Sequence, residues 1–390
     1  KHISGGNKMK KIAIVLVVLF ALMSITLAGC GAPAAEPDSS AAQTSAQASE
    51  AASVAPEASS TGGETGKTVK VGVAMKTLDN PYFIALAETL ENLCKEKGWE
   101  VTVLDAKNDI TEETKNIETF NSQNMDIIFL DAIDTLSCAP AVMAGKEAGV
   151  PTIVVDSGID PSAGASTSIS SDNQNNGIEV GKYAAKYFGD KQITAAQISG
   201  TKGHPTGLIR RAGIYAGIFE ARLGLSPEDA WNRALEFEQQ LTDNGKASDE
   251  EAKLEIVGQG WGNWTADGGL PAMEDLLVAN PNINAVFGEN DNMLIGAMTA
   301  LENANKLDSV AIFASADGQK EAYEMIKEGT AYKATGENNP VKVAEQAMNI
   351  ASQIIDDGKD PYSFEAEIFT DANCVNPENV DQFYDPDSLF

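Results

Sequence analysis

The sequence predicts an α/β protein built from two similar lobes, each with a parallel β-sheet covered by helices on both faces. From residue 69 onward, short apolar runs alternate with amphipathic segments, an order that is typical of doubly wound parallel sheets. The same order starts again at residue 193. Because each half is too long for a single strand–helix–strand unit, two lobes are expected.

The first half of this pattern contains four expected strands and two expected helices. Residues 81–97 are expected to form a helix, because Phe83, Leu86 and Leu90 recur at helical spacing and Gly98 follows the last turn. A second helix is expected at residues 139–148. The strands are short apolar runs at residues 69–75, 101–104, 127–131 and 150–156.

The second half repeats the alternation and contains one irregular stretch. Residues 225–252 are acidic and without clear periodicity, so an insertion or surface hairpin is expected there rather than core. The expected strands are residues 193–198, 254–257, 285–287 and 310–316. The expected helices are residues 208–223, 272–279, 293–304 and a last one that ends near Gly329.

The N-terminal part of the chain is predicted to be a targeting segment rather than part of the fold. Basic residues precede an apolar run at residues 12–22, and small residues then lead into Cys30, so residues 1–29 have the pattern of a secretory signal peptide with its true start at Met9. The tetrapeptide LAGC that ends at Cys30 resembles a bacterial lipoprotein cleavage box, which implies lipidation of that thiol. The alternative is an ordinary signal peptide with a chance cysteine.

The segment after Cys30 supports the lipoprotein interpretation. It is dominated by Ala, Ser, Glu, Pro, Thr and Gly and has no aromatic residue, so it cannot bury a core. Residues 30–68 are therefore expected to be the lipidated cysteine and a disordered linker that tethers the protein to the outer face of the bacterial cytoplasmic membrane.

Composition excludes several classes of function. The formal net charge is −29 at pH 7, and such an acidic chain does not offer the basic surface that nucleic acid requires. The chain has two histidines, and only His204 lies beyond the signal peptide, which argues against a histidine-rich metal site or a Ser-His-Asp hydrolase. Cys94, Cys138 and Cys374 show no zinc-binding spacing. No metal, cofactor or enzymatic activity is expected.

Polar and aromatic residues gather after the expected strands. In open parallel sheets, ligands bind beyond the carboxyl ends of the strands, so these residues are expected to share one site. Planar polar groups that form paired hydrogen bonds, together with aromatic rings, suit the vicinal hydroxyls and apolar faces of a sugar. The candidates are Asn80, Tyr82, Phe83, Asp156, His204, Arg210, Trp264, Asn290, Asp317 and Glu337.

Each candidate also has a simpler interpretation. Asn80 precedes Pro81 and is a suitable helix N-cap, and Asp317 could cap the following turn. Arg210 could be a solvated helix charge, and Trp264 could belong to the core. His204 could be a loop residue. The common position at strand ends is what favours the binding-site interpretation.

These segments resemble the ribose-binding and galactose/glucose-binding proteins of bacterial ABC importers, from residue 69 to about residue 384. Residues 77–83 (TLDNPYF) match the first ligand loop of that family, which implies that Asn80 and Tyr82 contact the sugar, with Phe83 close by. Arg210 matches the guanidinium ligand. The resemblance assigns further ligand roles to Asp156, His204, Trp264, Asn290, Asp317 and Glu337.

The resemblance also implies an architecture and a mechanism. It implies a type I periplasmic binding protein, in which two lobes joined by three crossing strands close over the ligand by a hinge. Tyr82 and Trp264 would sandwich the sugar ring, and the crossings would lie near Asp172, Glu337 and Ile368. The implied lobes are residues 69–172 with 338–367, and residues 173–337 with 368–390.

The implied function is capture of a monosaccharide, a pentose, hexose or related polyol, by a monomer that delivers it to the permease of an ABC importer. Ser157, Thr206 and Glu337 depart from the family pattern at positions that select the sugar. One alternative is the ligand-binding domain of a sugar-sensing or chemotaxis system. Another is an exported glycosidase that uses Asp156 and Asp317 as paired carboxylates.

Overall fold

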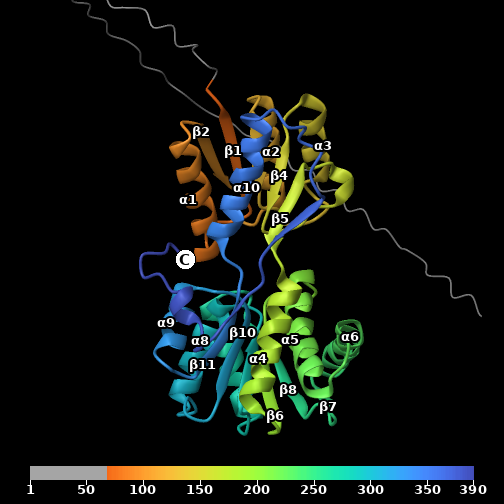
Figure 1. The fold of residues 1–390 in the computed structure, drawn as a ribbon, viewed down its shortest axis with the longest axis vertical. Helices are drawn as coiled ribbons and strands as arrows, with labels where there is room; N and C mark the ends of the chain where they lie inside the picture. Colours follow the sequence, from red (N-terminus) through yellow and green to blue (C-terminus); the bar gives the residue numbers. More distant parts are fainter. Residues whose placement is uncertain (1–67) are drawn as a thin grey trace, which may run out of the picture. The chain divides into compact units, whose positions relative to one another are not determined.

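The computed structural model describes residues 68–390, which form two lobes, each built on its own β-sheet (Figure 1). The predicted signal peptide, the lipidation site Cys30 and all but the last residue of the predicted linker lie outside the described residues. Both sheets are predominantly parallel and have helices on both faces, which confirms the predicted fold class.

The first lobe contains a six-stranded, wholly parallel sheet with the strand order β12-β5-β4-β3-β1-β2. One face packs against α1 and α10, and the other against α2 and α3. The strands are β1 (Lys70–Met75), β2 (Glu100–Asp105), β3 (Ile127–Leu130), β4 (Thr152–Val155), β5 (Thr167–Ser171) and β12 (Glu367–Thr370). The helices are α1 (Pro81–Glu96), α2 (Ile110–Ser122), α3 (Ala139–Ala148) and α10 (Pro340–Ile355), and a short 3-10 turn, η1, covers Pro161–Ala163.

The second lobe contains a seven-stranded sheet with the order β13-β11-β10-β9-β6-β8-β7, in which only the edge strands β13 and β7 are antiparallel. Helices α4, α5 and α6 cover one face, and α7, α8 and α9 cover the other. The strands are β6 (Ile193–Ser199), β7 (Ala247–Asp249), β8 (Leu254–Trp261), β9 (Ala285–Gly288), β10 (Ala311–Asp317), β11 (Tyr332–Glu337) and β13 (Cys374–Val375). The helices are α4 (Asn173–Phe188), α5 (Pro205–Leu223), α6 (Pro227–Asn244), α7 (Ala266–Ala279), α8 (Asp291–Asn303) and α9 (Lys320–Lys327), followed by the 3-10 turn η2 (Val380–Gln382).

The prediction for residues 225–252 is wrong, because this stretch contains α6 and contributes to the core. Ala230, Ala234, Phe237 and Leu241 recur at helical spacing and are buried, and the ring of Phe237 packs edge-to-face on Tyr215 with centroids 4.9 Å apart. Ser226 caps the first turn, and a glycine in left-handed conformation ends the helix. Apart from the buried Glu238, the acidic residues of the helix lie outside this apolar stripe, so the stripe is easily overlooked in the sequence.

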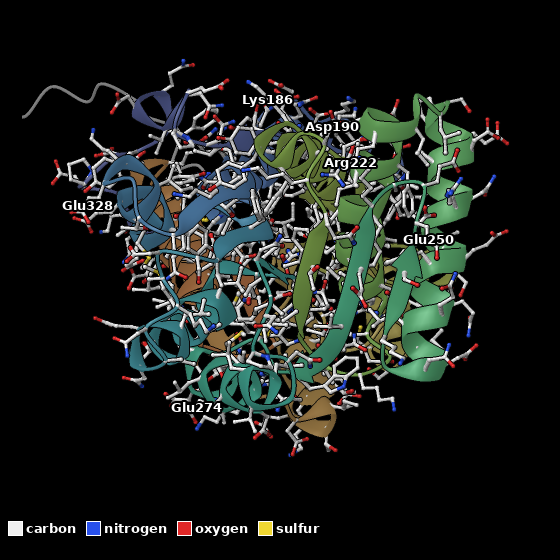
Figure 2. The ribbon with its side chains drawn as sticks, turned by 90° about the horizontal axis from the view of Figure 1, so that it is seen from below. Lys186, Asp190, Arg222, Glu250, Glu274 and Glu328 are labelled. Atoms are coloured by element: carbon white, nitrogen blue, oxygen red, sulfur yellow. The ribbon has the colours of Figure 1, made fainter. Side chains whose placement is uncertain are left out.

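The exposed outer surface carries many charges of both signs. The labelled residues of the second lobe include exposed acids, namely Asp190, Glu250, Glu274 and Glu328, and an exposed cation, Lys186 (Figure 2). Acidic residues outnumber basic ones in the chain, which has a net charge of −29, and such an excess disfavours polyanionic partners. Within residues 68–390, no helix has the length and apolar character required to cross a membrane.

The chain passes between the lobes three times. The first passage joins β5 to α4 at Asp172, and the second joins β11 to α10. The third lies at residues 371–373 rather than near Ile368, because β12 continues to Thr370 and Ile368 pairs with Ile169 in the first sheet. The tail is also not confined to the second lobe, since Phe390 belongs to the core of the first.

Candidate ligand-binding site

A cavity of about 320 Å³ lies where the carboxyl ends of the two sheets meet. It is lined by residues that follow β1, β4, β6 and β11 and by the last residue of β10, as expected for a ligand site in open parallel sheets. Its volume falls at the lower end of the range of about 300–1,000 Å³ for small-molecule pockets. The predicted residues that line it are Asn80, Tyr82, Phe83, Asp156, His204, Arg210, Trp264, Asn290 and Asp317.

A larger hollow of about 830 Å³ lies at the opposite end of the second sheet, next to Phe188, Asn284 and Lys333. It opens beside the beginnings of β10 and β11, where parallel sheets do not place their ligands. The smaller cavity between the lobes is therefore the better candidate, because it combines strand ends with convergent polar groups.

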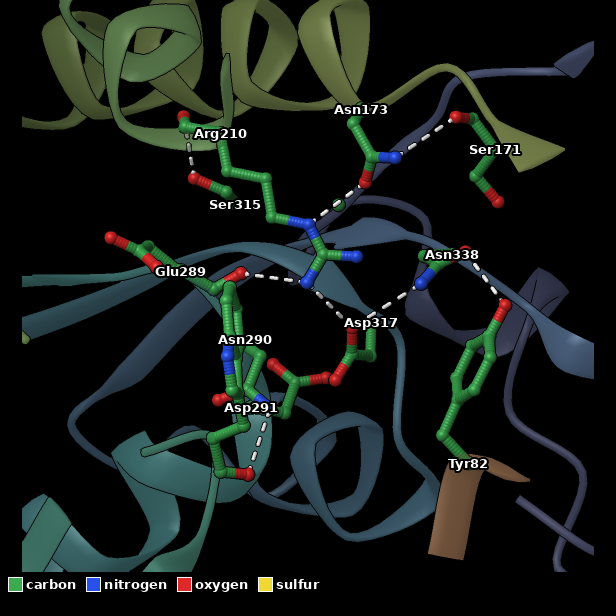
Figure 3. Close-up of polar contacts among 12 residues, drawn as sticks. Tyr82, Ser171, Asn173, Arg210, Glu289, Asn290, Asp291, Ser315, Asp317 and Asn338 are labelled. Atoms are coloured by element: carbon green, nitrogen blue, oxygen red, sulfur yellow. Dashed lines mark hydrogen bonds and ion pairs between the residues drawn. The ribbon is translucent and has the colours of Figure 1, made fainter. Parts of the chain in front are cut away.

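Arg210 is held in a fixed orientation at the wall of this cavity (Figure 3). Its Nε donates to Oδ1 of Asn173 at 2.8 Å, and its Nη1 donates to the backbone oxygen of Glu289 at 3.1 Å and to Oδ1 of Asp317 at 3.0 Å. Within residues 68–390, no acceptor is hydrogen bonded to Nη2. Because three bonds orient the planar guanidinium, Nη2 is held in place with its N–H groups unused by the described residues.

Asp317 connects Arg210 to the hinge and to the first lobe (Figure 3). Burial raises the pKa of Asp317, and the adjacent Arg210 guanidinium opposes this rise. Asn338 donates from Nδ2 to Oδ1 of Asp317 at 3.4 Å and accepts at its own Oδ1 from the Tyr82 hydroxyl at 3.1 Å. A continuous polar chain thus runs from Arg210 to Tyr82 and would be sensitive to the relative position of the lobes.

A second charged cluster lies around Lys76, a residue that was not among the predicted candidates. The Lys76 ammonium lies 3.0 Å from Oδ1 of Asp131, 3.0 Å from Oδ2 of Asp156 and 2.7 Å from Oγ of Ser157. Lys76 directly follows β1, so the strand-end rule would have found it had it been applied from the first residue after the strand. It also provides a cation beside Ser157, a position at which the chain departs from the pattern of the family that it resembles.

The three ionisable groups of this cluster have pKa values that are shifted in different directions. Burial disfavours the charge of Lys76, but the two carboxylates outweigh it and raise the pKa of the amine. Burial raises the pKa of Asp131 to about 7. Burial acts in the same direction on Asp156, but Lys76 outweighs it and lowers the pKa of that carboxyl. Asp156 is therefore an ionised acceptor at neutral pH, suited to a ligand hydroxyl.

Trp264 lies in the left-handed region of backbone conformation and packs closely on the backbone of the site. Asn263 and Trp264 have φ values of +49° and +65°, an arrangement that costs energy for residues other than glycine and often occurs at ligand sites. The indole lies directly against the backbone of Gly200, where an added Cβ would be 2.1 Å from the ring. His204 packs on the indole with ring centroids 5.6 Å apart, and the Arg210 guanidinium lies 5.7 Å from the indole centroid.

Tyr82 and His204 are both neutral hydrogen-bonding groups at neutral pH. Burial, reinforced by the Asp156 carboxylate, raises the pKa of Tyr82 well above its usual value, so the phenol keeps its proton. Desolvation and the nearby Lys76 and Arg210 cations lower the pKa of His204. Each residue can therefore donate to or accept from a ligand hydroxyl without a change of charge.

The cap interpretation and the binding-site interpretation of Asn80 and Asn290 are compatible. Oδ1 of Asn80 accepts from the backbone nitrogen of Tyr82 at 2.9 Å, and Oδ1 of Asn290 accepts from that of Met293 at 3.1 Å. The Asn290 amide nitrogen also donates to the Trp264 backbone oxygen at 3.3 Å. The Asn80 amide nitrogen has no hydrogen bond to another residue of the described chain, so it remains a donor toward the cavity.

Glu337 does not line the cavity, in contrast to the sequence-based expectation. Its carboxylate is buried at the hinge, where Oε2 accepts from Asn373 Nδ2 at 2.8 Å and Oε1 lies 2.7 Å from the Lys342 ammonium. Asn176 joins the same network by donating to the Glu337 backbone oxygen at 2.8 Å. Successive residues of a strand point to opposite sides, and it is the next residue, Asn338, that lines the cavity.

Asn173 and Asn338 also line the cavity and were not predicted. Both lie at interlobe passages, where the sequence indicates the boundary between the lobes but not the direction of each side chain.

Within residues 68–390, no group of His, Cys, Asp and Glu is arranged to hold a metal ion. Cys94, Cys138 and Cys374 are all unpaired thiols.

The chain is similar in sequence to known binding proteins. A family model described as a periplasmic binding protein domain matches residues 71–360. The ribose import binding protein RbsB of Bacillus subtilis (strain 168) is 26% identical over 289 residues, which is 74% of this chain and 82% of that protein. The D-apiose import binding protein of Actinobacillus succinogenes is 26% identical over 288 residues, again 74% of this chain and 82% of the relative.

A solved structure shows the same fold. It is an ABC transporter periplasmic solute binding protein from Actinobacillus succinogenes 130z with bound D-allose, which is 26% identical, has a TM-score of 0.67 and covers 81% of this chain and 100% of its own. These similarities confirm the predicted resemblance to sugar-binding proteins of ABC importers and the type I fold.

Proposed function

The chain belongs to the periplasmic binding protein family, and we propose that it captures a monosaccharide between its two lobes and delivers it to the permease of an ABC importer. The observation that carries this proposal is the cavity of about 320 Å³, in which Arg210 Nη2 and the Asn80 amide are oriented donors and Asp156 is an ionised acceptor. These groups match the vicinal hydroxyls of a pentose, hexose or related polyol.

The aromatic residues support a ring-shaped ligand. Tyr82 and Phe83 come from the first lobe and Trp264 from the second, and all three line the cavity. A sugar ring has apolar C–H faces that pack on aromatic side chains, and each lobe supplies at least one aromatic ring to the cavity. Both lobes contribute, so hinge closure would surround the ligand and exclude water from its hydrogen bonds.

A thermal-shift screen against pentoses, hexoses and polyols tests this function. A bound sugar raises the melting temperature by mass action, because it binds only the folded protein. Calorimetry then gives the affinity, and the Trp264→Ala variant should lose most of it while keeping the fold. A response only to amino acids or peptides would remove the sugar assignment.

We further propose that the protein is anchored on the extracellular face of the membrane through lipid on Cys30. The motif LAGC at residues 27–30 and the linker composition support this proposal. Mass spectrometry of the N-terminal peptide of the membrane-bound protein tests it, with Cys30→Ala as the control. An unmodified Cys30 in the mature protein would contradict it.

The alternative roles use the same cavity and differ in the outcome they predict. In a sensing or chemotaxis role, the sugar-loaded protein would bind a receptor instead of a permease. A glycosidase would need two carboxylates with separated pKa values, and the pKa values of Asp156 and Asp317 are indeed shifted in opposite directions. However, both carboxylates already pair with Lys76 and Arg210, so binding without turnover is expected. Hydrolysis of a glycoside by the purified protein would support the enzyme instead.

A further inference from the structure

The tail segment, defined as residues 385–390, reaches from the second lobe to the first beside the cavity. It follows η2 of the second lobe, and the chain end lies between the two lobes beside α1 (Figure 1). Phe390 is only 6% exposed and belongs to the apolar cluster of the first lobe, whereas its neighbour Leu389 is 54% exposed. One side chain of the tail is thus inserted into the other lobe, and the adjacent one is not.

A polar contact attaches the tail segment to the second lobe, and further bonds lie within the tail itself. The Lys320 ammonium, at the start of α9, donates to the backbone oxygen of Ser388 at 2.9 Å. The Ser388 hydroxyl accepts from the Phe390 backbone nitrogen at 3.3 Å and donates to its backbone oxygen at 2.9 Å. Just before the segment, Phe383 and Tyr384 pack on the apolar cluster of the second lobe. The tail is therefore a non-covalent link between lobes, in addition to the three chain passages.

Phe390 contacts Tyr82, which forms part of the cavity wall. The two rings meet edge-to-face, with centroids 5.5 Å apart and an interplanar angle of 88°. Phe83 contacts the same Tyr82 ring from another direction, at 5.4 Å and 80°. The Tyr82 hydroxyl is bonded to Asn338 at 3.1 Å. Phe390 is thus among the side chains that hold this ring in its orientation.

We propose that Phe390 is a positioning residue that sets the affinity for the sugar by holding the Tyr82 ring in its binding orientation. The inference rests on the proposed sugar-binding function. Edge-to-face aromatic pairs have a preferred geometry, and loss of one such contact would let the Tyr82 ring reorient, so replacement of Phe390 should weaken sugar binding by roughly three- to tenfold.

The first test compares Phe390→Ala with Leu389→Ala, which alters the exposed neighbour in the same segment. The probe is the monosaccharide that gives the largest thermal shift with the unaltered protein, and affinity is measured by calorimetry. We expect weaker binding for Phe390→Ala and unchanged binding for Leu389→Ala. Equal affinity of Phe390→Ala and the unaltered protein would overturn the inference but not the sugar-binding function, whereas failure of the unaltered protein to bind any sugar would overturn both.

A double-mutant cycle separates positioning from a general structural effect. If Phe390 acts through Tyr82, Phe390→Ala should cause little further loss of affinity in a Tyr82→Ala background. A merely structural role would cause the same loss in both backgrounds, and that result would overturn the inference. Phe390→Leu keeps an apolar side chain in the cluster but removes the ring, so it should still bind more weakly; full affinity in this variant would also contradict the proposal.

Discussion

Arg210→Lys is the most informative single change, because it retains the positive charge and removes only the shape of the side chain. The guanidinium uses Nε for Asn173 and Nη1 for Glu289 and Asp317, and these bonds direct Nη2 toward the cavity. A lysine ammonium can neutralise Asp317, but it cannot also reproduce the fork that places a separate donor against the ligand. The fold should therefore be retained, since Asp317 keeps a counter-charge.

The magnitude follows from the number of bonds lost to the ligand. A hydrogen bond that involves a charged group contributes about 1.5–3 kcal/mol, so loss of the Nη2 donor should weaken sugar binding by roughly 10- to 150-fold. Arg210→Ala should be more severe, because it also leaves Asp317 buried without its cation. In that variant the pKa of Asp317 should rise further, since burial already raises it and Arg210 opposes that rise.

Calorimetry at neutral pH, together with the melting temperature of the sugar-free protein, measures both effects. Arg233→Lys is a matched control, because Arg233 lies in α6, pairs with Asp249 and Glu251, and does not line the cavity. It should bind sugar normally. If Arg210→Lys bound the sugar within about twofold of the unaltered protein, Nη2 would not be a ligand donor and the reasoning would be refuted.

Three further changes test other parts of the structure. Gly200→Ala should reduce sugar affinity at least tenfold, because the new Cβ displaces Trp264 by steric conflict, and calorimetry would show it. Phe237→Ala should destabilise the fold by about 3–5 kcal/mol in urea unfolding, as expected for a buried aromatic core residue; a change below about 1 kcal/mol would restore the surface-insertion interpretation. Asp131 holds its proton in the folded state up to a pKa of about 7, so its stabilising contribution is complete below about pH 4 and is lost as the pH rises toward 7. Asp131→Asn should therefore flatten the fall in melting temperature between pH 5 and 8, whereas Asp109→Asn at an exposed cap should not.

The strands and most helices could be read from the sequence because their signals are local. Buried parallel strands appear as continuous apolar runs, and caps such as Asn80 before Pro81 mark where helices begin. The helix α6 was missed because its stripe of Ala and Phe residues is narrow within an acidic segment. The helix is buried through the contacts of Phe237 with Tyr215 and Phe219. These two residues belong to another helix, α5, so the local pattern of α6 does not reveal the contacts.

The site shows the same division between local and tertiary information. The order of residues shows that polar and aromatic side chains follow the strands, and the rule for parallel sheets predicts that Asn80, Asp156 and Asp317 meet at one cavity. The packing of the two lobes and the tail is what places Glu337 at the hinge, Lys76 beside Asp156, and Phe390 against Tyr82. A periodic pattern specifies which residues end a strand, but the direction of an end residue and its partners depend on how the two sheets and the tail pack together.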